Sequence, residues 1–376
     1  MNMRKLIAWL HRWLGAVSSL FILLIALSGT MLAFMGELFL LQHGEILHAS
    51  PPSSKSEYAT VETLIDSATD GYGSAFKTMG VLMPQTRIDK VETAIVFGLP
   101  AGTDSVDQLL MLSVDPWTAA YKGDFLLRHT FGHELVEFHH SLLLGEAGIV
   151  FVCVIALLLI VMCLSGLYMW WPRQGSVWRK ASTISFRGNL KRIVLSLHGL
   201  VGVWLSLLIL FFSISGIATA KPGWFEPLLV APTHEPPTTS EFEQTCDGII
   251  NVGQAQSSGE SVFPERSLAF FFLPNRENGP YLLTYREMGD GNKLEGDGRV
   301  FVHASCKDVV HVEDLHLSET PTQLANMMLS LHGGYSFGKT FGDILVLLCG
   351  IGLIGLAGSG LYLFLTGFFR SNQQNS

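Results

Sequence analysis

The stretch LHRWLGAVSSLFILLIALSG, residues 10–29, decides the fold, because its pattern returns as LHGLVGVWLSLLILFFSISG at residues 197–216. In each copy one histidine, His11 or His198, begins a long apolar run that closes on a Ser-Gly pair seventeen residues further on. A histidine inside a membrane helix is costly and therefore needs a partner or a function. Two such histidines in the same register indicate an object shared by two helices.

The composition predicts a membrane protein. The chain of 376 residues is 48% hydrophobic and 15% charged, whereas soluble domains average about 25% charged residues. The deficit lies in four uncharged runs, residues 13–36, 147–172, 193–220 and 344–369. Each run exceeds the roughly 20 residues that a helix needs to span a bilayer. We therefore expect an all-helical membrane core of four transmembrane helices.

The basic residues predict the orientation of these helices. Residues 173–192 carry six bases and no acid, whereas residues 38–130 carry 11 acids against 6 bases and residues 223–322 carry 16 against 6. Because basic loops stay in the cytoplasm, both termini are expected there, and both acidic segments are expected on the outside of the membrane. The expected order is helix 1 (1–37), external domain (38–130), helix 2 (131–172), cytoplasmic loop (173–192), helix 3 (193–221), external domain (222–323), helix 4 (324–370) and cytoplasmic tail (371–376).

Each external segment reads as a small α+β domain. Helical periodicity marks residues 58–68 and 241–254, and strand-like pieces occur at 77–83, 91–99, 108–114, 268–273, 280–286 and 299–304. Cys246 and Cys306 share the second segment. Sequence does not supply the geometry of a disulfide, so their pairing stays open.

A second repeat relates helices 2 and 4. His139 and His332 each have a glycine six residues on, and a Ser-Gly-Leu-Tyr sequence begins 26 or 27 residues on. The chain thus reads as two parallel pseudo-repeats of helix, external domain and helix, related by an axis along the membrane normal. The Ser-Gly pairs are small and would allow close helix contact.

The four histidines predict two haems. His11 and His198 fall at the cytoplasmic face, and His139 and His332 at the external face, so each pair can meet across the axis. Two facing imidazoles suit the axial positions of a b-type haem, and filling both positions favours electron transfer. Zinc is the weaker alternative, because pairs at opposite faces cannot form one tetrahedral site. His140 is the alternative ligand to His139, since neighbouring helical residues diverge by about 100°.

Several other residues are candidates for the same sites. Arg12 and Arg192 are placed for the propionates of the inner haem, or equally for lipid phosphate. His129 and His133, with His140, line the external haem edge or touch substrate, unless they are solvated interfacial histidines. Arg128 and Tyr335 are further candidates for substrate contact.

The motifs resemble a known family. LLMLSVDPWTAAYKG, residues 109–123, resembles the closing hairpin of a PepSY domain, with Ala119 where that hairpin usually has glycine. LHRWLG, FHHSLLLG, LSLHGLVG and LSLHGG together resemble the PepSY-associated transmembrane family, and within it the FoxB/PiuB-type inner-membrane siderophore reductases. The resemblance implies a di-haem oxidoreductase that reduces a ferric siderophore, of the hydroxamate type, and releases Fe(II) in the periplasm.

Two alternatives stay open. One is a b-type cytochrome of a quinol or other redox chain with a different acceptor. The other is a membrane-anchored PepSY binding module without redox activity. The sequence has no Rossmann glycine fingerprint, so the electron donor is expected to be external, a quinol or a cytoplasmic reductase. The acidic external segments argue against a nucleic-acid partner.

Overall fold

The computed structural model describes residues 2–52, 57–84, 90–172, 176, 188–225, 250–276, 279–287, 296–305, 309–318 and 320–373. The chain forms two compact units. The helical unit contains Met1–Ala33, Leu135–Phe225 and Leu331–Ser376, and the sheet unit contains Phe34–Glu134 and Glu226–Ser330.

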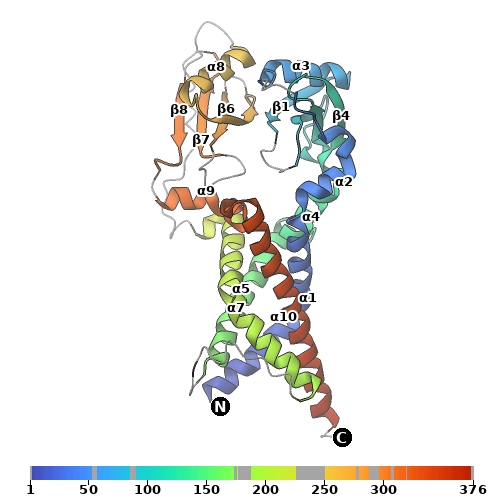
Figure 1. Ribbon diagram of the computed structural model, residues 1–376, viewed down its shortest axis with the longest axis vertical. Coiled ribbons are helices and arrows are strands. Elements are labelled where there is room, and N and C mark those ends of the chain that lie inside the picture. Colours follow the sequence, from blue (N-terminus) through green and yellow to red (C-terminus); the bar gives the residue numbers. More distant parts are fainter. Residues whose placement is uncertain are drawn as a thin grey trace. The chain divides into compact units, whose positions relative to one another are not determined.

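Four long helices build the helical unit: α1 (Met3–Leu32), α5 (Gly145–Trp170), α7 (Leu190–Ala220) and α10 (Lys339–Gln373). All four are long and apolar enough to cross a membrane, which confirms the four predicted spans. The shortest has 26 residues and so measures about 39 Å, against about 30 Å for the hydrocarbon core of a bilayer. α1 and α7 each pack against both α5 and α10, so α1 and α7 stand at opposite corners of the bundle. α1 begins and α10 ends at the same end of it (Figure 1).

The repeat extends to the helix caps. Asn2 precedes α1 and Asn189 precedes α7, and their side-chain oxygens accept from the backbone N–H groups of Arg4 at 3.2 Å and Arg192 at 3.1 Å. These bonds satisfy N–H groups that the first turn of a helix leaves without a partner. The caps fix where each helix starts and hence the height of His11 and His198.

The second and fourth spans do not begin at their histidines. His139 lies near the end of a separate helix, α4 (Phe131–Ser141), and His332 ends α9 (Thr320–His332). Leu142 and Leu143 have φ of 51° and 61°, and Gly334 has φ of 81°. Residues in this left-handed region end an α-helix. The continuous segments expected over 131–172 and 324–370 are therefore each broken just after the histidine.

The sheet unit holds one antiparallel sheet with the strand order β4-β3-β2-β1-β5-β6-β7-β8. The strands are β1 (Phe76–Leu82), β2 (Ala94–Pro100), β3 (Leu110–Val114), β4 (Tyr121–Leu126), β5 (Ser267–Phe272), β6 (Pro280–Arg286), β7 (Gly298–His303) and β8 (Val309–Asp314). β1 pairs with β5, opposing Val81 to Phe271. The expectation of two separate external domains is thus corrected: the two segments share one sheet.

The seam between β1 and β5 needs a glycine. A Cβ on Gly80 would lie 2.5 Å from the carbonyl oxygen of Phe271 and 2.7 Å from Cζ of Phe97. Both distances are far shorter than a van der Waals contact, so a side chain here would separate the strands. Gly80 therefore permits the backbone approach that joins the two halves of the sheet.

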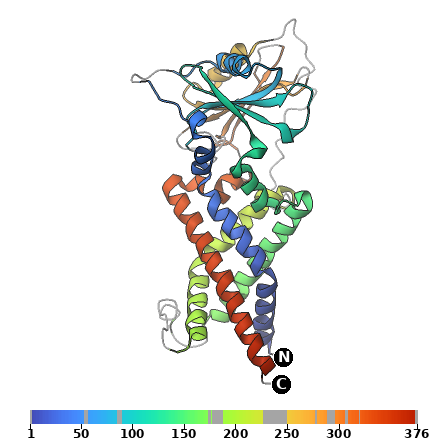
Figure 2. The same cartoon turned by 90° about the vertical axis from the view of Figure 1, so that its right-hand side faces the viewer.

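Helices cover the two faces of this sheet. α3 (Val61–Tyr72) and α8 (Val252–Val262) share one face (Figure 2). Their buried residues form a single apolar core with the strands. On the other face, α2 (Met35–Leu47) packs Phe39 and Leu47 against Ile95, Phe125 and Phe270. α2 and β8 were not predicted. The helix predicted over 241–254 falls largely outside the described residues, as do Cys246, Cys306 and most of the loop 173–192.

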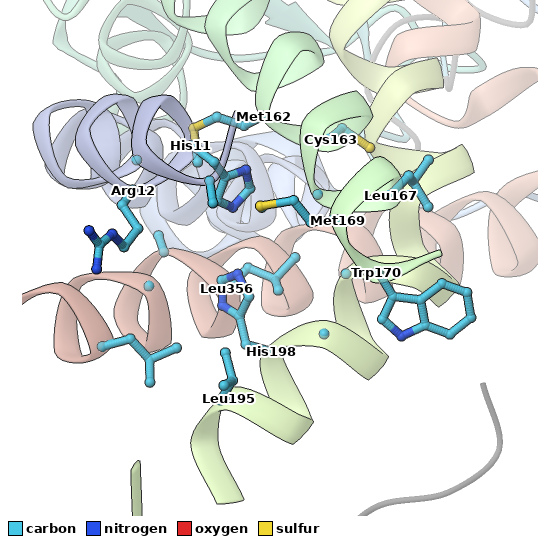
Figure 3. A pocket seen from close by; sticks show the side chains of 18 of the residues that line it. His11, Arg12, Met162, Cys163, Leu167, Met169, Trp170, Leu195, His198 and Leu356 are labelled. Carbon is cyan, nitrogen blue, oxygen red and sulfur yellow. The ribbon is translucent and has the colours of Figure 1, made fainter. Parts of the chain in front are cut away.

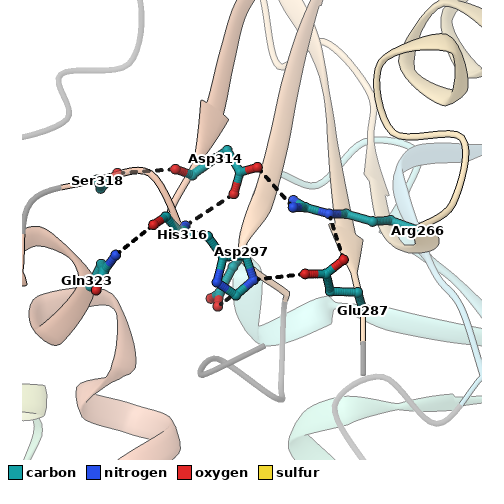
Figure 4. Close-up of polar contacts among 7 residues, drawn as sticks. All are labelled: Arg266, Glu287, Asp297, Asp314, His316, Ser318 and Gln323. Atoms are coloured by element: carbon teal, nitrogen blue, oxygen red, sulfur yellow. Dashed lines mark hydrogen bonds and ion pairs between the residues drawn. The ribbon is translucent and has the colours of Figure 1, made fainter. Parts of the chain in front are cut away.

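A polar network fixes the loop between β8 and α9 (Figure 4). Arg266 pairs with Asp314 at 2.9 Å and with Glu287 at 3.4 Å, and His316 Nε2 lies 3.2 Å from Glu287. Gln323 Nε2 donates to the carbonyl oxygen of His316 at 3.0 Å, which ties the first turn of α9 to the loop. The network therefore sets where α9 starts.

Candidate functional site

The structure brings together the two histidines of each predicted pair. The ring centres of His11 and His198 are 6.5 Å apart, with an angle of 89° between the ring planes. Those of His139 and His332 are 6.1 Å apart, with an angle of 34°. Each pair joins helices that are not consecutive in the chain. We refer to His11 and His198 as the first pair, and to His139 and His332 as the second pair.

A serine holds each ring of the first pair. His11 Nδ1 lies 2.9 Å from Ser165 Oγ of α5, and His198 Nδ1 lies 2.8 Å from Ser359 Oγ of α10. The two serine hydroxyls donate their own protons to backbone oxygens of their helices, at 3.0 Å and 3.1 Å. A hydroxyl has one proton, so a serine that donates to its own helix accepts from Nδ1–H. That tautomer leaves Nε2 as the atom that would bind a metal.

The second pair follows the same rule. His139 Nδ1 lies 3.2 Å from Ser28 Oγ and 3.0 Å from the carbonyl oxygen of Ile25, both on α1. His332 Nδ1 lies 3.3 Å from Ser215 Oγ on α7. A carbonyl oxygen only accepts, so Nδ1 of His139 carries the proton. The serine hydroxyls again donate within their own helices, and Nε2 is left as the ligand atom.

The glycine of each Ser-Gly pair makes room for the ring. A Cβ on Gly29 would lie 2.6 Å from Cε1 of His139, and a Cβ on Gly216 would lie 2.7 Å from Cε1 of His332. The corresponding distances at Gly166 and Gly360 to the rings of the first pair are 3.3 Å and 3.5 Å. The sequence reading of these pairs as helix contacts missed this role. The signal was present, because the Ser-Gly pairs follow the histidines at 17 residues in helices 1 and 3 and at 26 or 27 residues in helices 2 and 4.

The ring spacing fits one metal ion between each pair. A metal–imidazole bond is about 2.0 Å and the ring centre lies about 1.1 Å beyond the nitrogen, so two rings on opposite sides of one metal have centres roughly 6.2 Å apart. The observed 6.5 Å and 6.1 Å lie on either side of that value. Among the described residues, no group of three or more His, Cys, Asp or Glu is arranged for a metal ion. Each site thus offers two imidazoles, a donor set that could hold a haem iron.

The first pair faces a cavity of about 980 Å³ (Figure 3). This volume is at the upper end of ligand pockets, which run from about 300 to 1,000 Å³. The cavity wall is mostly apolar and includes Met162, Met169 and Trp170. Its charged lining residues among those described are Lys5 and Arg12, both cationic. A haem is an apolar disc with carboxylate groups at one edge, so its disc would suit the apolar lining and its carboxylates would suit the two cations.

The predicted cations have different positions. Arg12 lines the cavity, as does Lys5, which the sequence analysis did not single out. Arg192 is not among the lining residues, and its side chain packs beside Gly188. Lys221 at the end of α7 forms an ion pair of 2.8 Å with Glu146 at the start of α5, a contact that no sequence pattern indicated.

Burial keeps the second pair neutral. α4 and α9 lie outside the four spans, and burial, reinforced by the repulsion that a protonated His332 would exert, lowers the pKa of His139 to about 4. Burial also lowers the pKa of His332. Neutral imidazole is the form that binds metals. His139, rather than its neighbour His140, is the residue whose ring meets His332.

The candidates for substrate contact are distributed over both units. Arg128, His129 and His133 belong to the sheet unit, and Tyr335 belongs to the helical unit. Arg128 is ion-paired with Asp107 at 2.9 Å, and the His129 carbonyl oxygen accepts from Gln42 at 3.0 Å. Their roles toward a substrate stay predictions.

The bundle and its two imidazole pairs define a four-helix membrane protein with two paired-histidine sites. The chain belongs to the family described as the PepSY-associated TM region, whose pattern matches residues 8–366. The match covers all four spans and both histidine pairs, which confirms the family indicated by the sequence motifs. No curated protein matches the chain.

Proposed function

We propose that this protein is a di-haem oxidoreductase of the bacterial inner membrane, which passes electrons to a ferric siderophore in the periplasm and releases Fe(II). The observation that carries the proposal is the pair geometry: two pairs of imidazoles, each at the spacing for one iron and each with Nδ1 held by a serine of a neighbouring helix. A haem with two axial imidazoles supplies one-electron transfer. Membership of a membrane family agrees with this assignment.

The chain contributes position and surroundings. Ser165 and Ser359 orient one pair of rings, and Ser28 and Ser215 orient the other. The mostly apolar cavity gives the first pair apolar surroundings, and Lys5 and Arg12 at its wall match two propionates. These features support a resident prosthetic group rather than an exchangeable substrate.

The two sites divide the path across the membrane. His11 and Ser28 lie on the same helix α1, seventeen residues apart, which corresponds to about 25 Å at 1.5 Å per residue. Ser28 contacts His139, so this length approximates the separation of the two pairs along the bundle. One group could not carry an electron over that length quickly, and a second group at the far end shortens each step.

The proposal also includes the topology inferred from sequence. The two halves of the chain form parallel pseudo-repeats, with α1 and α7 as the first helices of each. The basic loop and both termini are cytoplasmic, and the sheet unit, built from two PepSY-like halves, is periplasmic. Ferric iron held by hard oxygen ligands binds more weakly after reduction, so one electron suffices to loosen it. A quinol or a cytoplasmic reductase supplies that electron.

The test is an anaerobic absorption experiment on the purified full chain. We expect two haems per chain, a b-type spectrum on reduction, and return to the oxidised spectrum on addition of a ferric hydroxamate siderophore. Iron-free siderophore is the control and should leave the haems reduced. If the haems stay reduced after ferric siderophore is added, the protein is a cytochrome with another electron acceptor. Protein that binds no haem under haem-replete expression would remove the redox proposal and favour a membrane-anchored binding module.

A further inference from the structure

The two histidine pairs have similar ring spacings but differ in the angle between their ring planes. The rings of the first pair are almost perpendicular, at 89°, whereas those of the second pair are inclined by 34°. Within each pair the two histidines come from equivalent positions of the repeat, whereas the first pair and the second pair stand in different local sequences. The difference lies in how neighbouring helices orient each ring.

Each ring plane is fixed by an off-axis contact. An imidazole bound through Nε2 can rotate about the bond to the metal, and Nδ1 moves on a circle as it rotates. A hydrogen bond from Nδ1–H to a serine of a neighbouring helix therefore stops that rotation. The bonds are 2.9 Å and 2.8 Å in the first pair. In the second pair Ile25 adds a carbonyl acceptor to His139 at 3.0 Å, and Gly29 and Gly216 confine the rings sterically.

The angle between the ring planes decides the electronic structure of a low-spin ferric haem. Each imidazole interacts through its π system with the iron d orbital that lies perpendicular to the ring plane. Parallel rings act on the same orbital and split the two dπ levels. Perpendicular rings act on one orbital each and leave the levels nearly equal in energy. In electron paramagnetic resonance, nearly equal dπ levels give a strongly anisotropic low-spin signal, and split dπ levels give a rhombic low-spin signal.

We propose that Ser165 and Ser359, and likewise Ser28 and Ser215, are positioning residues that hold the two haem irons in different ligand geometries. The inference rests on the proposed function, because it needs haem at both pairs. It assigns the strongly anisotropic low-spin iron to His11 and His198, and the rhombic low-spin iron to His139 and His332. The serines also add electron density to the imidazoles by accepting Nδ1–H, which stabilises the ferric state.

The experiment is electron paramagnetic resonance of the oxidised full chain, with a redox titration of the same sample. We expect two low-spin signals in equal amounts, one strongly anisotropic and one rhombic. His11→Leu should remove only the anisotropic signal, and His139→Leu only the rhombic one. The double variant Ser165→Ala with Ser359→Ala should change the anisotropic signal and raise the midpoint potential of that haem, with the rhombic signal unchanged.

Ser206→Ala is the matched control. Ser206 is a buried serine of α7 that donates to its own helix at 2.7 Å and is not bonded to any of the four imidazoles. It should leave both signals and both potentials unchanged. Two haems with the same type of signal, or signals and potentials unaffected by the double variant, would overturn the inference and leave the reductase proposal standing. Absence of haem would overturn both. Haems that ferric siderophore does not reoxidise would overturn only the reductase, so the signals still decide the ring geometry.

Discussion

Replacing Gly29 by alanine tests the second histidine pair directly. The added Cβ would lie 2.6 Å from Cε1 and 3.1 Å from Nδ1 of His139, both of them ring atoms. An ordinary contact begins at about 3.4 Å, so the ring must retreat by roughly 0.8 Å, which is a large part of a metal–nitrogen bond of about 2.0 Å. The ring cannot retreat and also keep its 6.1 Å spacing to His332. We expect Gly29→Ala to bind one haem per chain instead of two.

The chain offers its own controls for this prediction. Gly166 has a similar position beside His11, but a Cβ there would lie 3.3 Å from the ring, and at Gly360 the distance to His198 is 3.5 Å. Gly166→Ala and Gly360→Ala should therefore keep two haems. Alanine favours a helix over glycine by about 1 kcal/mol, so loss of haem in Gly29→Ala would not follow from a weaker α1.

The assay is the haem content per chain, measured by the absorbance of the extracted pyridine complex against protein concentration. Gly216→Ala, with a Cβ distance of 2.7 Å to His332, should repeat the loss. Two haems per chain in both Gly29→Ala and Gly216→Ala would refute the reasoning. An equal loss in Gly166→Ala would also refute it, because the effect would then not follow the distances.

Three further predictions concern other parts of the chain. Ala119 has φ of 54°. A left-handed alanine costs about 1–2 kcal/mol, whereas glycine loses about 0.5–1 kcal/mol of chain entropy. Ala119→Gly should therefore stabilise the sheet unit by up to about 1.5 kcal/mol in denaturant unfolding. A lower unfolding midpoint would contradict it. Gly80→Ala should destabilise that unit by more than about 2 kcal/mol through the 2.5 Å contact with the Phe271 oxygen, and no loss of stability would argue against the β1–β5 seam. The double variant Lys5→Gln with Arg12→Gln should lose the haem of the first pair to apomyoglobin faster than the unchanged protein does. The haem of the second pair is the internal reference. If the first haem leaves both proteins at the same rate, these cations are not propionate partners.

The spans were predictable, whereas the joining of the sheet was not. The four uncharged runs are local signals, and all four became helices. The β1–β5 pairing joins Val81 to Phe271, which are far apart in the sequence, and no local pattern reports such a partner. α2 was missed because the apolar sequence continues through Ala33 and Phe34, where the structure breaks the helix.

The histidines could be predicted from sequence repetition, whereas the role of the residues that hold them could not. Repetition marked His11, His139, His198 and His332, because a costly residue kept at the same register in two copies implies a common role. The Ser-Gly pairs repeat as clearly, but a small polar pair in a membrane helix has an ordinary explanation in close packing. Only the distances from Nδ1 to serine oxygens of about 3 Å separate the two explanations. The helices break after His139 and His332 because leucines or a glycine there adopt left-handed backbone conformations. No periodic sequence pattern predicts such a conformation.

The contacts divide each site between the two halves of the chain. Within the first half, α1 supplies His11 and the serine for His139, and α5 supplies the serine for His11. The second half repeats this with α7 and α10. Each half thus positions one imidazole of each pair. A metal that needs two axial ligands would bind only the assembled bundle. Its binding free energy would therefore also stabilise the contact between the halves.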